Sequence, residues 1–434
     1  MLLENCKKRR KKLVEKLPEN SLVIISNSTA SIRSNDVEYK FKPDSDFYYL
    51  TGLEEPDSVC LIKKEKRSFV YILFVEERNK EKEIWVGKTI GIDGAKSIFK
   101  ADEAYKISDF DIHLKKLIQG VEHIYYPIGK NKCLELKITN LINELAKSNR
   151  SGFKVPRTIS DLRNLIHEMR LIKDTYEINC MKNAAEISKN AHILAMAYAR
   201  AGMFEYEIEA ILEYKFRALG ASGPAYPSIV GSGRNSTILH YIKNTRRIQN
   251  GDLVLIDAGA EFNYYASDVT RTFPVNKKFS AVQKDIYDIV LEAQLKAIEQ
   301  VKPQKQFIDS YNKAVLVLVE GLKELGLLKG SNESIIKSGK YKKFFMHKLG
   351  HWLGLDVHDA GPYVDKNDRS IKLVPGMVMT VEPGIYIPLD LGDVPKKFRG
   401  IGIRIEDDIL VTERGNSILT GDIPKMVHEI ENFG

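Results

Sequence analysis

The sequence lacks long hydrophobic runs and has few cysteines. No apolar stretch approaches the ~18 residues that span a bilayer. No apolar segment of ~7–15 residues follows the basic cluster Lys7 to Lys12, so we expect neither a membrane anchor nor a secretory signal. The four cysteines are scattered without a CxxC pair, which is typical of a reducing compartment and disfavours structural zinc. We therefore expect a cytoplasmic protein.

A concentrated excess of one charge is also missing. The net charge of +8 comes from 66 Lys and Arg against 58 Asp and Glu, which are mixed along most of the 434 residues. The cluster Lys7 to Lys12 is typical of a solvated helix face. We therefore expect no nucleic-acid partner.

The composition is that of a globular protein with a sizeable core. Hydrophobic residues make up 43% and charged residues 29% of the chain. At ~150 residues per domain the length predicts two or three domains, and the sequence pattern favours two. Residues 1–172, where short apolar runs such as SLVIIS and FVYILFV alternate with helical segments, form a mixed α/β domain. Residues 173–434 begin with a long amphipathic helix and continue as strands flanked by helices.

Two aspartates interrupt strand-like sequence in the second domain. Leu253 to Ile256 form a continuous apolar run that predicts a strand buried on both faces, and Asp257 follows directly. Asp268 lies in a second strand-like segment after Tyr265. A buried carboxylate requires a cation or several hydrogen-bond donors, so the pair alone leaves metal binding and capped acids both open.

Two more acids repeat this arrangement near the C-terminus. Glu382 ends the apolar strand from Met377. Glu406 lies on a long predicted strand, two residues after Arg404, so both side chains share one face of that strand. A plain Arg and Glu pair on a strand is the simpler alternative. Asp407 and Asp408 are expected to be exposed or supporting, with no assigned role.

Histidines cluster in the segment HKLGHWLGLDVHD. His347, His351 and His358 are three of the nine histidines and lie within twelve residues. The spacing of the first two imitates a helical zinc motif, but Lys348 replaces its glutamate and the nearby glycines disfavour a helix. Any one of these histidines could be an ordinary hydrogen-bonded residue, whereas the group indicates a site.

Four strand-borne acids and one histidine together predict a metal centre. Clustered in an apolar sheet, the carboxylates would repel each other unless cations neutralise them, and two divalent ions would do so. Oxygen ligands with one imidazole favour Mn²⁺, with Co²⁺, Fe²⁺ or Zn²⁺ as alternatives. Two such ions activate water for hydrolysis, and the spacing leaves open whether an amide, an ester or a phosphoryl group is attacked.

Four segments resemble the successive motifs of metallopeptidases with the methionine aminopeptidase/creatinase "pita-bread" fold. In chain order they are DAGAEFNYYASDVTRTFP, HKLGHWLGLDVHD, TVEPGIYI and GIRIEDDILVT. Within that group the chain is similar to the aminopeptidase P family. The segment KPDSDFYYLTGLEEPDS resembles the N-terminal domain of that family, so the resemblance covers the whole chain. It implies an α/β (α+β) architecture, in which the second domain has a curved, mostly antiparallel sheet flanked by helices.

The resemblance also implies a set of metal ligands. Asp257 would bind one ion, Asp268 and Glu406 would bridge both ions, and His351 and Glu382 would complete the second. Glu382 would also be the acid/base partner of a hydroxide that bridges the two ions.

Further residues are implied around the substrate. His240, His347 and His358 would steady the scissile carbonyl, the tetrahedral intermediate or the leaving proline nitrogen. Arg404 is implied to take part in catalysis, and Arg404 and Tyr386 would support the metal ligands.

The implied reaction is removal of the first residue from peptides with proline in second position. The bond before proline is a tertiary amide, because the proline ring removes the N–H and fixes φ. A pocket including Tyr226 and Trp352 could bind that ring, although ordinary core packing explains Trp352 equally well. The resemblance further suggests a homo-oligomer, a dimer or a tetramer.

Three alternatives remain at this point. A prolidase of the same fold would share the five ligands and act on Xaa-Pro dipeptides. A non-catalytic peptide-binding module could use the same scaffold, although all five ligand types are present. A two-metal phosphoesterase would fit the carboxylates but not the histidine segment.

Overall fold

The computed structural model describes residues 1–147 and 155–433. The chain forms two compact units, Met1–Met169 and Arg170–Gly434. The sequence pattern had placed this boundary slightly later, between residues 172 and 173. Helix α7 (Arg163–Leu171) carries the chain from the first unit into the second.

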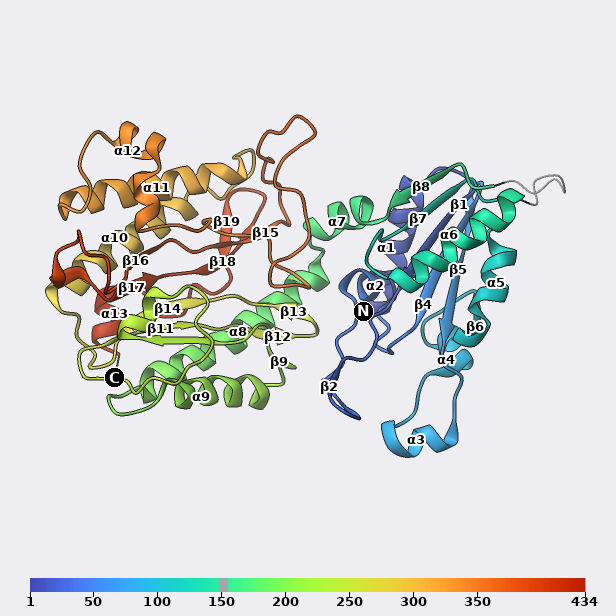
Figure 1. The fold of residues 1–434 in the computed structure, drawn as a ribbon, viewed down its shortest axis with the longest axis horizontal. Helices are drawn as coiled ribbons and strands as arrows, with labels where there is room; N and C mark the ends of the chain where they lie inside the picture. Colours follow the sequence, from blue (N-terminus) through green and yellow to red (C-terminus); the bar gives the residue numbers. More distant parts are fainter. Residues whose placement is uncertain (148–154, 434) are drawn as a thin grey trace. The chain divides into compact units, whose positions relative to one another are not determined.

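The N-terminal unit is a six-stranded mixed sheet with helices (Figure 1). Its elements before α7 are α1 (Leu2–Lys16), β1 (Ser21–Ser26), β2 (Ile32–Ser34), β3 (Val37–Glu38), α2 (Ser45–Thr51), β4 (Val59–Glu65), β5 (Ser68–Val75), α3 (Lys80–Val86), α4 (Gly91–Ser97), β6 (Glu103–Lys106), α5 (Phe110–Leu117), β7 (His123–Tyr126), α6 (Lys132–Lys147) and β8 (Thr158–Asp161). The strand order is β6-β5-β4-β1-β7-β8, with β4 antiparallel to both of its neighbours. Alternate residues of β1, Leu22 and Ile24, share a core with Leu114 of α5 and Ile138 of α6, as the apolar runs of this domain predict.

The C-terminal unit consists of short strands between two pairs of long helices (Figure 1). Its elements are α8 (Thr175–Tyr198), α9 (Glu205–Ala218), β9 (Gly223–Pro224), β10 (Ile229–Ser232), β11 (Leu253–Asp257), β12 (Ala260–Phe262), β13 (Tyr265–Ala266), β14 (Thr270–Pro274), α10 (Ala281–Ile298), α11 (Phe307–Glu324), α12 (Asn332–Ser338), β15 (Val378–Val381), β16 (Gly384–Ile387), β17 (Ile401–Arg404), β18 (Asp407–Val411), β19 (Asn416–Ile418) and α13 (Val427–Glu431). The strands pair in the orders β10-β11-β14, β13-β12-β9, β15-β18-β19 and β16-β17, and every pair is antiparallel. The predicted fold class, mostly antiparallel strands flanked by helices, is confirmed.

A backbone hydrogen bond connects the strands β10 to β14 with the strands β15 to β19, the two halves of the C-terminal unit. The amide of Glu406, between β17 and β18, donates to the carbonyl of Thr270 at the start of β14 (3.1 Å). A single core runs through both halves and includes Val254 of β11, Val290 of α10 and Ile403 of β17. The two sets of strands are therefore held edge to edge around one site.

Local sequence explains how the second unit begins. Asp174 caps α8 by accepting from the amide of Glu177 (3.0 Å), and the Glu177 carboxylate accepts from the amide of Asp174 (2.9 Å). This reciprocal pair satisfies backbone donors that the helix cannot use itself. The five residues of β11 are all buried, as its apolar run predicts.

Two segments near the site are not continuous strands. The segment before His240 contains a 3₁₀ turn (Gly233–Thr237). The loop wraps around buried Glu205, which accepts hydrogen bonds from the amides of Ser232 (2.7 Å) and Arg246 (2.8 Å), so these donors are not available for sheet pairing. The long strand predicted from Ile401 is likewise interrupted at Glu406 by the bond to the neighbouring half.

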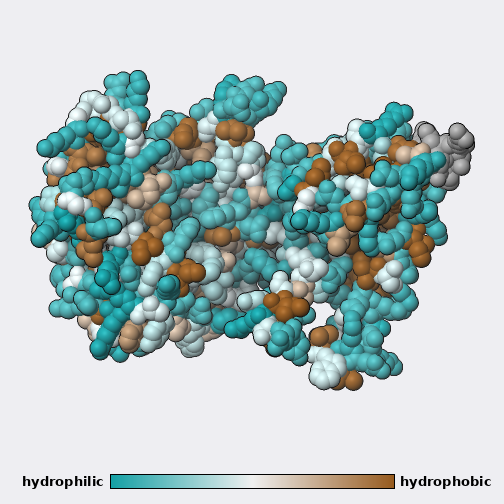
Figure 2. All heavy atoms as spheres, in the orientation of Figure 1, coloured by the Kyte–Doolittle hydropathy of each residue, from teal (hydrophilic) through white to brown (hydrophobic). Residues whose placement is uncertain are grey.

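The molecular surface fits the mixed charge pattern. On the face that Figure 2 shows, hydrophobic residues form small groups among hydrophilic ones. Within residues 1–147 and 155–433, no helix combines the length and the apolar character needed to cross a membrane.

Candidate metal centre

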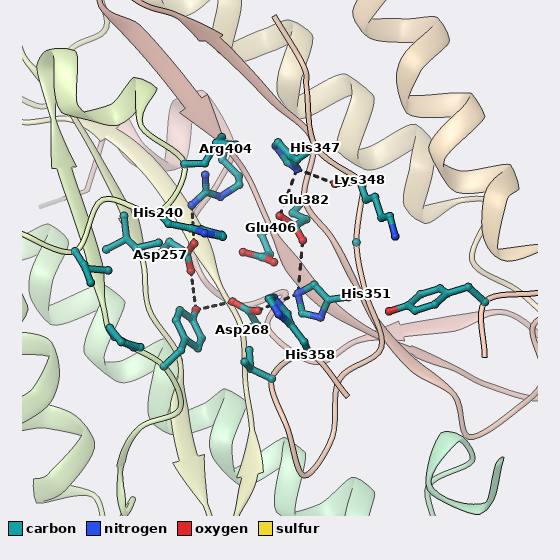
Figure 3. A pocket seen from close by; sticks show the side chains of 18 residues that line it. His240, Asp257, Asp268, His347, Lys348, His351, His358, Glu382, Arg404 and Glu406 are labelled. Atoms are coloured by element: carbon teal, nitrogen blue, oxygen red, sulfur yellow. Dashed lines mark hydrogen bonds and ion pairs between the residues drawn. The ribbon is translucent and has the colours of Figure 1, made fainter. Parts of the chain in front are cut away.

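Strand pairing brings the four predicted acids to one place (Figure 3). Asp257, the last residue of β11, lies opposite Thr270 of β14, so that Asp268 just before β14 is its near neighbour. Val381 of β15 pairs with Asp407 of β18, which places Glu382 beside Glu406. The hydrogen bond between the two halves then joins these pairs. All four acids line a cavity of about 630 Å³.

His351 completes the cluster. Its Nε2 atom lies 3.3 Å from Oδ2 of Asp268 and 3.6 Å from Oε1 of Glu382. Ligand atoms of Asp268, His351 and Glu406 all lie within 4.8 Å of one another. The structure thus brings together the five residues that the sequence nominated as ligands.

Crowding and burial change the acidity of this cluster. Burial, and then the charges of Asp268 and Glu382, raise the pKa of Glu406 well above its usual range. Burial also raises the pKa of Asp257, and it raises that of Glu382 to about 8. Burial lowers the pKa of His351, but its hydrogen bond to Asp268 and the charges of Asp268 and Glu382 outweigh this and raise it to about 9. Without cations, Glu382 and His351 therefore both hold a proton at neutral pH.

The permanent positive charge at the site does not balance the acids. Arg404 is buried and donates through Nη2 to Oδ2 of Asp257 (2.5 Å). Among the ion pairs of the described residues, none joins a Lys or Arg to Asp268, Glu382 or Glu406. An oxygen-rich, buried donor set with an excess of negative charge suits divalent cations, so these residues fit the predicted metal ions.

Arg404 also begins a chain of hydrogen bonds along the cavity wall. Its Nη1 donates to the hydroxyl of Tyr386 (3.0 Å), and that hydroxyl lies 2.9 Å from Nε2 of His347. Nδ1 of His347 lies 2.7 Å from the carbonyl of Lys348. Burial, and then the charge of Arg404, lower the pKa of His347 to about 4. His347 is therefore neutral, with Nδ1 as the donor and Nε2 accepting from Tyr386.

His240 and His358 line the same cavity from opposite loops (Figure 3). The His358 ring packs edge-on against the ring of His351, with centroids 4.3 Å apart. Burial, and then the charge of His351, lower the pKa of His358. Both imidazoles are placed to contact a molecule in the cavity.

The two residues nominated for a proline pocket differ in position. Tyr226 lines the cavity, and its hydroxyl lies 2.7 Å from Oδ1 of Asp257 and 2.5 Å from Oδ1 of Asp268. Trp352 is fully buried away from the cavity, where its Nε1 donates to the carbonyl of Pro362 (3.1 Å). Tyr363, which stacks on Trp352, lines the cavity in its place.

The acids next to Glu406 have supporting contacts. Asp407 and Asp408 are both buried, so of the two alternatives expected for them, exposed or supporting, the first is wrong. Asp408 accepts from the amide of Asp268 (3.1 Å) and the hydroxyl of Ser267 (2.9 Å), so it supports a predicted ligand. Asp407 pairs with buried Arg271 (2.7 Å). The alternation of β18 could have signalled one buried acid, but not two.

Comparison with known proteins identifies the family. Residues 179–413 match the model of metallopeptidase family M24, and residues 6–125 match that of the aminopeptidase P, N-terminal domain. The chain belongs to metallopeptidase family M24, as its motifs predict.

Individual relatives within this family are similar to the chain over nearly its full length. The chain is 43% identical to the Xaa-Pro aminopeptidase of Escherichia coli over 425 residues, which cover 98% of this chain and 96% of that protein. The structure of the Pseudomonas aeruginosa aminopeptidase PepP is similar with a TM-score of 0.97 and 45% identity, over 100% of this chain and 98% of that one. Aminopeptidase P from E. coli with the inhibitor Pro-Leu matches with a TM-score of 0.96 and 42% identity, over the same shares. The similarity therefore extends over both units.

Proposed function

We propose that this chain is an Xaa-Pro aminopeptidase, which removes the first residue from peptides with proline in second position. The observation that carries the proposal is the convergence of five potential ligands in one cavity of an M24 chain. The names of its full-length relatives support the substrate class. We assign the catalytic unit to residues 173–434.

The proposed cofactor is a pair of divalent ions, Mn²⁺ in the first place and Co²⁺, Fe²⁺ or Zn²⁺ as alternatives. We assign Asp257, Asp268, His351, Glu382 and Glu406 to hold them. Arg404 pairs with Asp257, but among the ion pairs of the described residues none joins a Lys or Arg to Asp268, Glu382 or Glu406, so the acids outnumber the permanent positive charges. When bound, such ions polarise the scissile carbonyl and lower the pKa of the attacking water.

Glu382 is the proposed acid/base group. Its carboxyl lines the cavity beside the other proposed ligands. In the ionised form that metal binding requires, it would accept a proton from the attacking water and return it to the leaving proline nitrogen. A tertiary amide nitrogen is a poor leaving group until it is protonated, so this transfer is essential.

The remaining polar groups would orient the peptide. His240 and His358 reach the cavity from two sides and can donate to the scissile carbonyl oxygen. Arg404 and Tyr386 fix neutral His347 through the hydrogen-bond chain described above. This arrangement holds the reacting groups in place before the substrate arrives.

The cavity also offers apolar surface for a proline ring. Ile229, Leu239, Ile242 and Val357 line it together with Tyr226 and Tyr363. We place the ring against these side chains, and we assign Trp352 to the support of Tyr363, because the two rings stack with centroids 5.5 Å apart.

The test measures hydrolysis of matched Xaa-Pro-Xaa and Xaa-Ala-Xaa peptides together with bound metal. We expect cleavage of the first series, its loss with a chelator, and its recovery with Mn²⁺. Glu406→Ala should lose metal and activity together, whereas the same change at exposed Glu413 should affect neither. Activity retained by a metal-free protein would refute the mechanism. Faster cleavage of Xaa-Pro dipeptides than of longer peptides would instead show a prolidase.

Assembly and location follow the same proposal. We infer a cytoplasmic homo-oligomer, a dimer or a tetramer, with peptides as its substrates. The four cysteines are all free, and three of them are buried, which supports a reducing compartment. Light scattering and fractionation test these two inferences.

A further inference from the structure

A buried ion cluster lies beneath the loop that carries two of the site histidines. Asp359 contacts Nη2 of Arg170 through Oδ1 (2.5 Å) and Nζ of Lys173 through Oδ2 (3.0 Å). The side chains of all three are at most 3% exposed. The same Nη2 atom also donates to the Asp356 carboxylate (2.8 Å). Asp359 is thus a buried anion held by two buried cations, and the more exposed Asp356 contacts one of them.

Stability alone does not explain such a cluster. Removing charges from water costs nearly as much as their attraction returns, so a buried ion group is weak evidence of net stabilisation. The cluster does fix the positions of its side chains, because each partner must occupy one place to remain paired. The question is which part of the molecule these contacts hold.

The backbone of Asp359 leads directly to His351. Its amide donates to the carbonyl of Trp352 (2.8 Å), and the same carbonyl oxygen lies 3.0 Å from Nδ1 of His351. This carbonyl keeps the imidazole proton on Nδ1. Nε2, 3.3 Å from Oδ2 of Asp268, is then the nitrogen that would give up its proton and face the proposed metal centre.

The same loop also fixes His358, which precedes Asp359 in the chain. Its ring packs against His351 at 4.3 Å between centroids. Gly354 makes the tight loop possible, because a Cβ atom there would lie 2.3 Å from Oδ2 of Asp359. The carbonyl of Gly354 accepts from the amide of Ala266 in β13 (2.8 Å), which ties the loop to the strands of the other half.

We propose that Asp359, held by Arg170 and Lys173, is a positioning residue that orients His351 and His358 for metal binding and substrate contact. The cations come from the end of α7 and the residues that follow it, so the segment that opens the C-terminal unit fixes a loop nearly two hundred residues later in the chain. The inference rests on the proposed metal site.

The experiment titrates the metal-free Asp359→Asn protein with Co²⁺ and follows visible absorption and calorimetric heat. Loss of a partner outside the ligand shell typically weakens metal binding ~10–100-fold, and we expect a loss of that size for the ion bound by His351, with a changed Co²⁺ spectrum. Asp44→Asn is the matched control, because Asp44 is a buried acid paired with Lys130 in the N-terminal unit. Its titration should equal that of the wild type.

Unchanged affinity and spectrum in folded Asp359→Asn protein would overturn the proposal, as would an equal loss in Asp44→Asn. If Asp359→Asn does not fold, Lys173→Met provides the test, because Asp359 keeps its contact with Arg170 in that variant. We expect an affinity loss approaching ~10-fold, and wild-type affinity in this variant would overturn the proposal. Because no substrate is used, this result is independent of whether wild-type protein cleaves Xaa-Pro peptides.

Discussion

Replacement of Glu382 by glutamine should stabilise the metal-free protein and weaken the stabilisation that metal provides. In the folded, metal-free chain, burial raises the pKa of this carboxyl from 4.5 to about 8. Between pH 4.5 and pH 7 this carboxyl is therefore ionised in the unfolded chain but still protonated in the folded chain. At ~1.4 kcal/mol per pH unit, this costs about 3 kcal/mol at pH 7. Glutamine has no proton to lose and avoids the cost.

The sign of the pH dependence follows from the raised pKa. The Glu382 contribution to stability is fully present below pH 4.5 and is lost as the pH rises towards 8. The advantage of Glu382→Gln should therefore be largest at pH 7 to 8 and vanish as the pH approaches 4.5. In a unit of this size about 3 kcal/mol corresponds to a rise in Tm of roughly 6–12 °C at most.

Thermal unfolding with and without Mn²⁺ between pH 5 and pH 8 checks this prediction. With chelator, the variant should melt above the wild type. With Mn²⁺ the wild type should gain more, because an amide is a poorer ligand than a carboxylate. Glu413→Gln, a change at an exposed acid, should leave both curves unaltered. A metal-free variant that melts at or below the wild type at pH 7 would refute the idea that crowded acids strain the site.

Further predictions concern the cavity wall. Tyr226→Phe removes the donor shared by Asp257 and Asp268, and urea unfolding of the metal-free protein should show a loss of about 1.5–3 kcal/mol; equal midpoints would contradict the assigned bond. Lys348 is an exposed cation that lines the cavity, so Lys348→Glu should lower kcat/KM for acidic peptides relative to neutral ones by roughly 2–5-fold; an unchanged ratio would show that it does not sense the substrate. A Cβ atom at Gly350 would lie 2.0 Å from the carbonyl of Thr380, and Gly350→Ala should reduce metal content in an atomic-absorption assay; full occupancy would mean that the loop can shift without harm.

Local patterns in the sequence were sufficient to predict that these acids lie at or next to buried strands. Asp257 ends a buried strand and Glu382 directly follows one, and apolar runs that finish in a carboxylate can be recognised without any knowledge of neighbouring strands. Placing them together required the motif resemblance, because the hydrogen bond that joins the two sets of strands, from Glu406 to Thr270, connects residues more than a hundred positions apart. The helices that flank the strands were predicted for the same local reasons.

Loops held by distant partners were beyond sequence reasoning. The shape of the segment before His240 depends on Glu205, and the position of His351 depends on Asp359 and two cations near residue 170. Trp352 illustrates the same limit, since its neighbours in the chain do not reveal whether its ring faces the cavity or the core. These side chains are oriented by tertiary contacts that no local periodicity encodes.

The hydrogen bond from Glu406 to Thr270 has a consequence for biosynthesis. Translation products that stop before residue 406 lack one of the four acids of the cluster and the bond that joins the two sets of strands. Under the proposed function, such products could not assemble the complete metal centre, and metal loading would follow docking of the strands around residue 406. Acquisition of the cations would then report that both sets of strands have folded together.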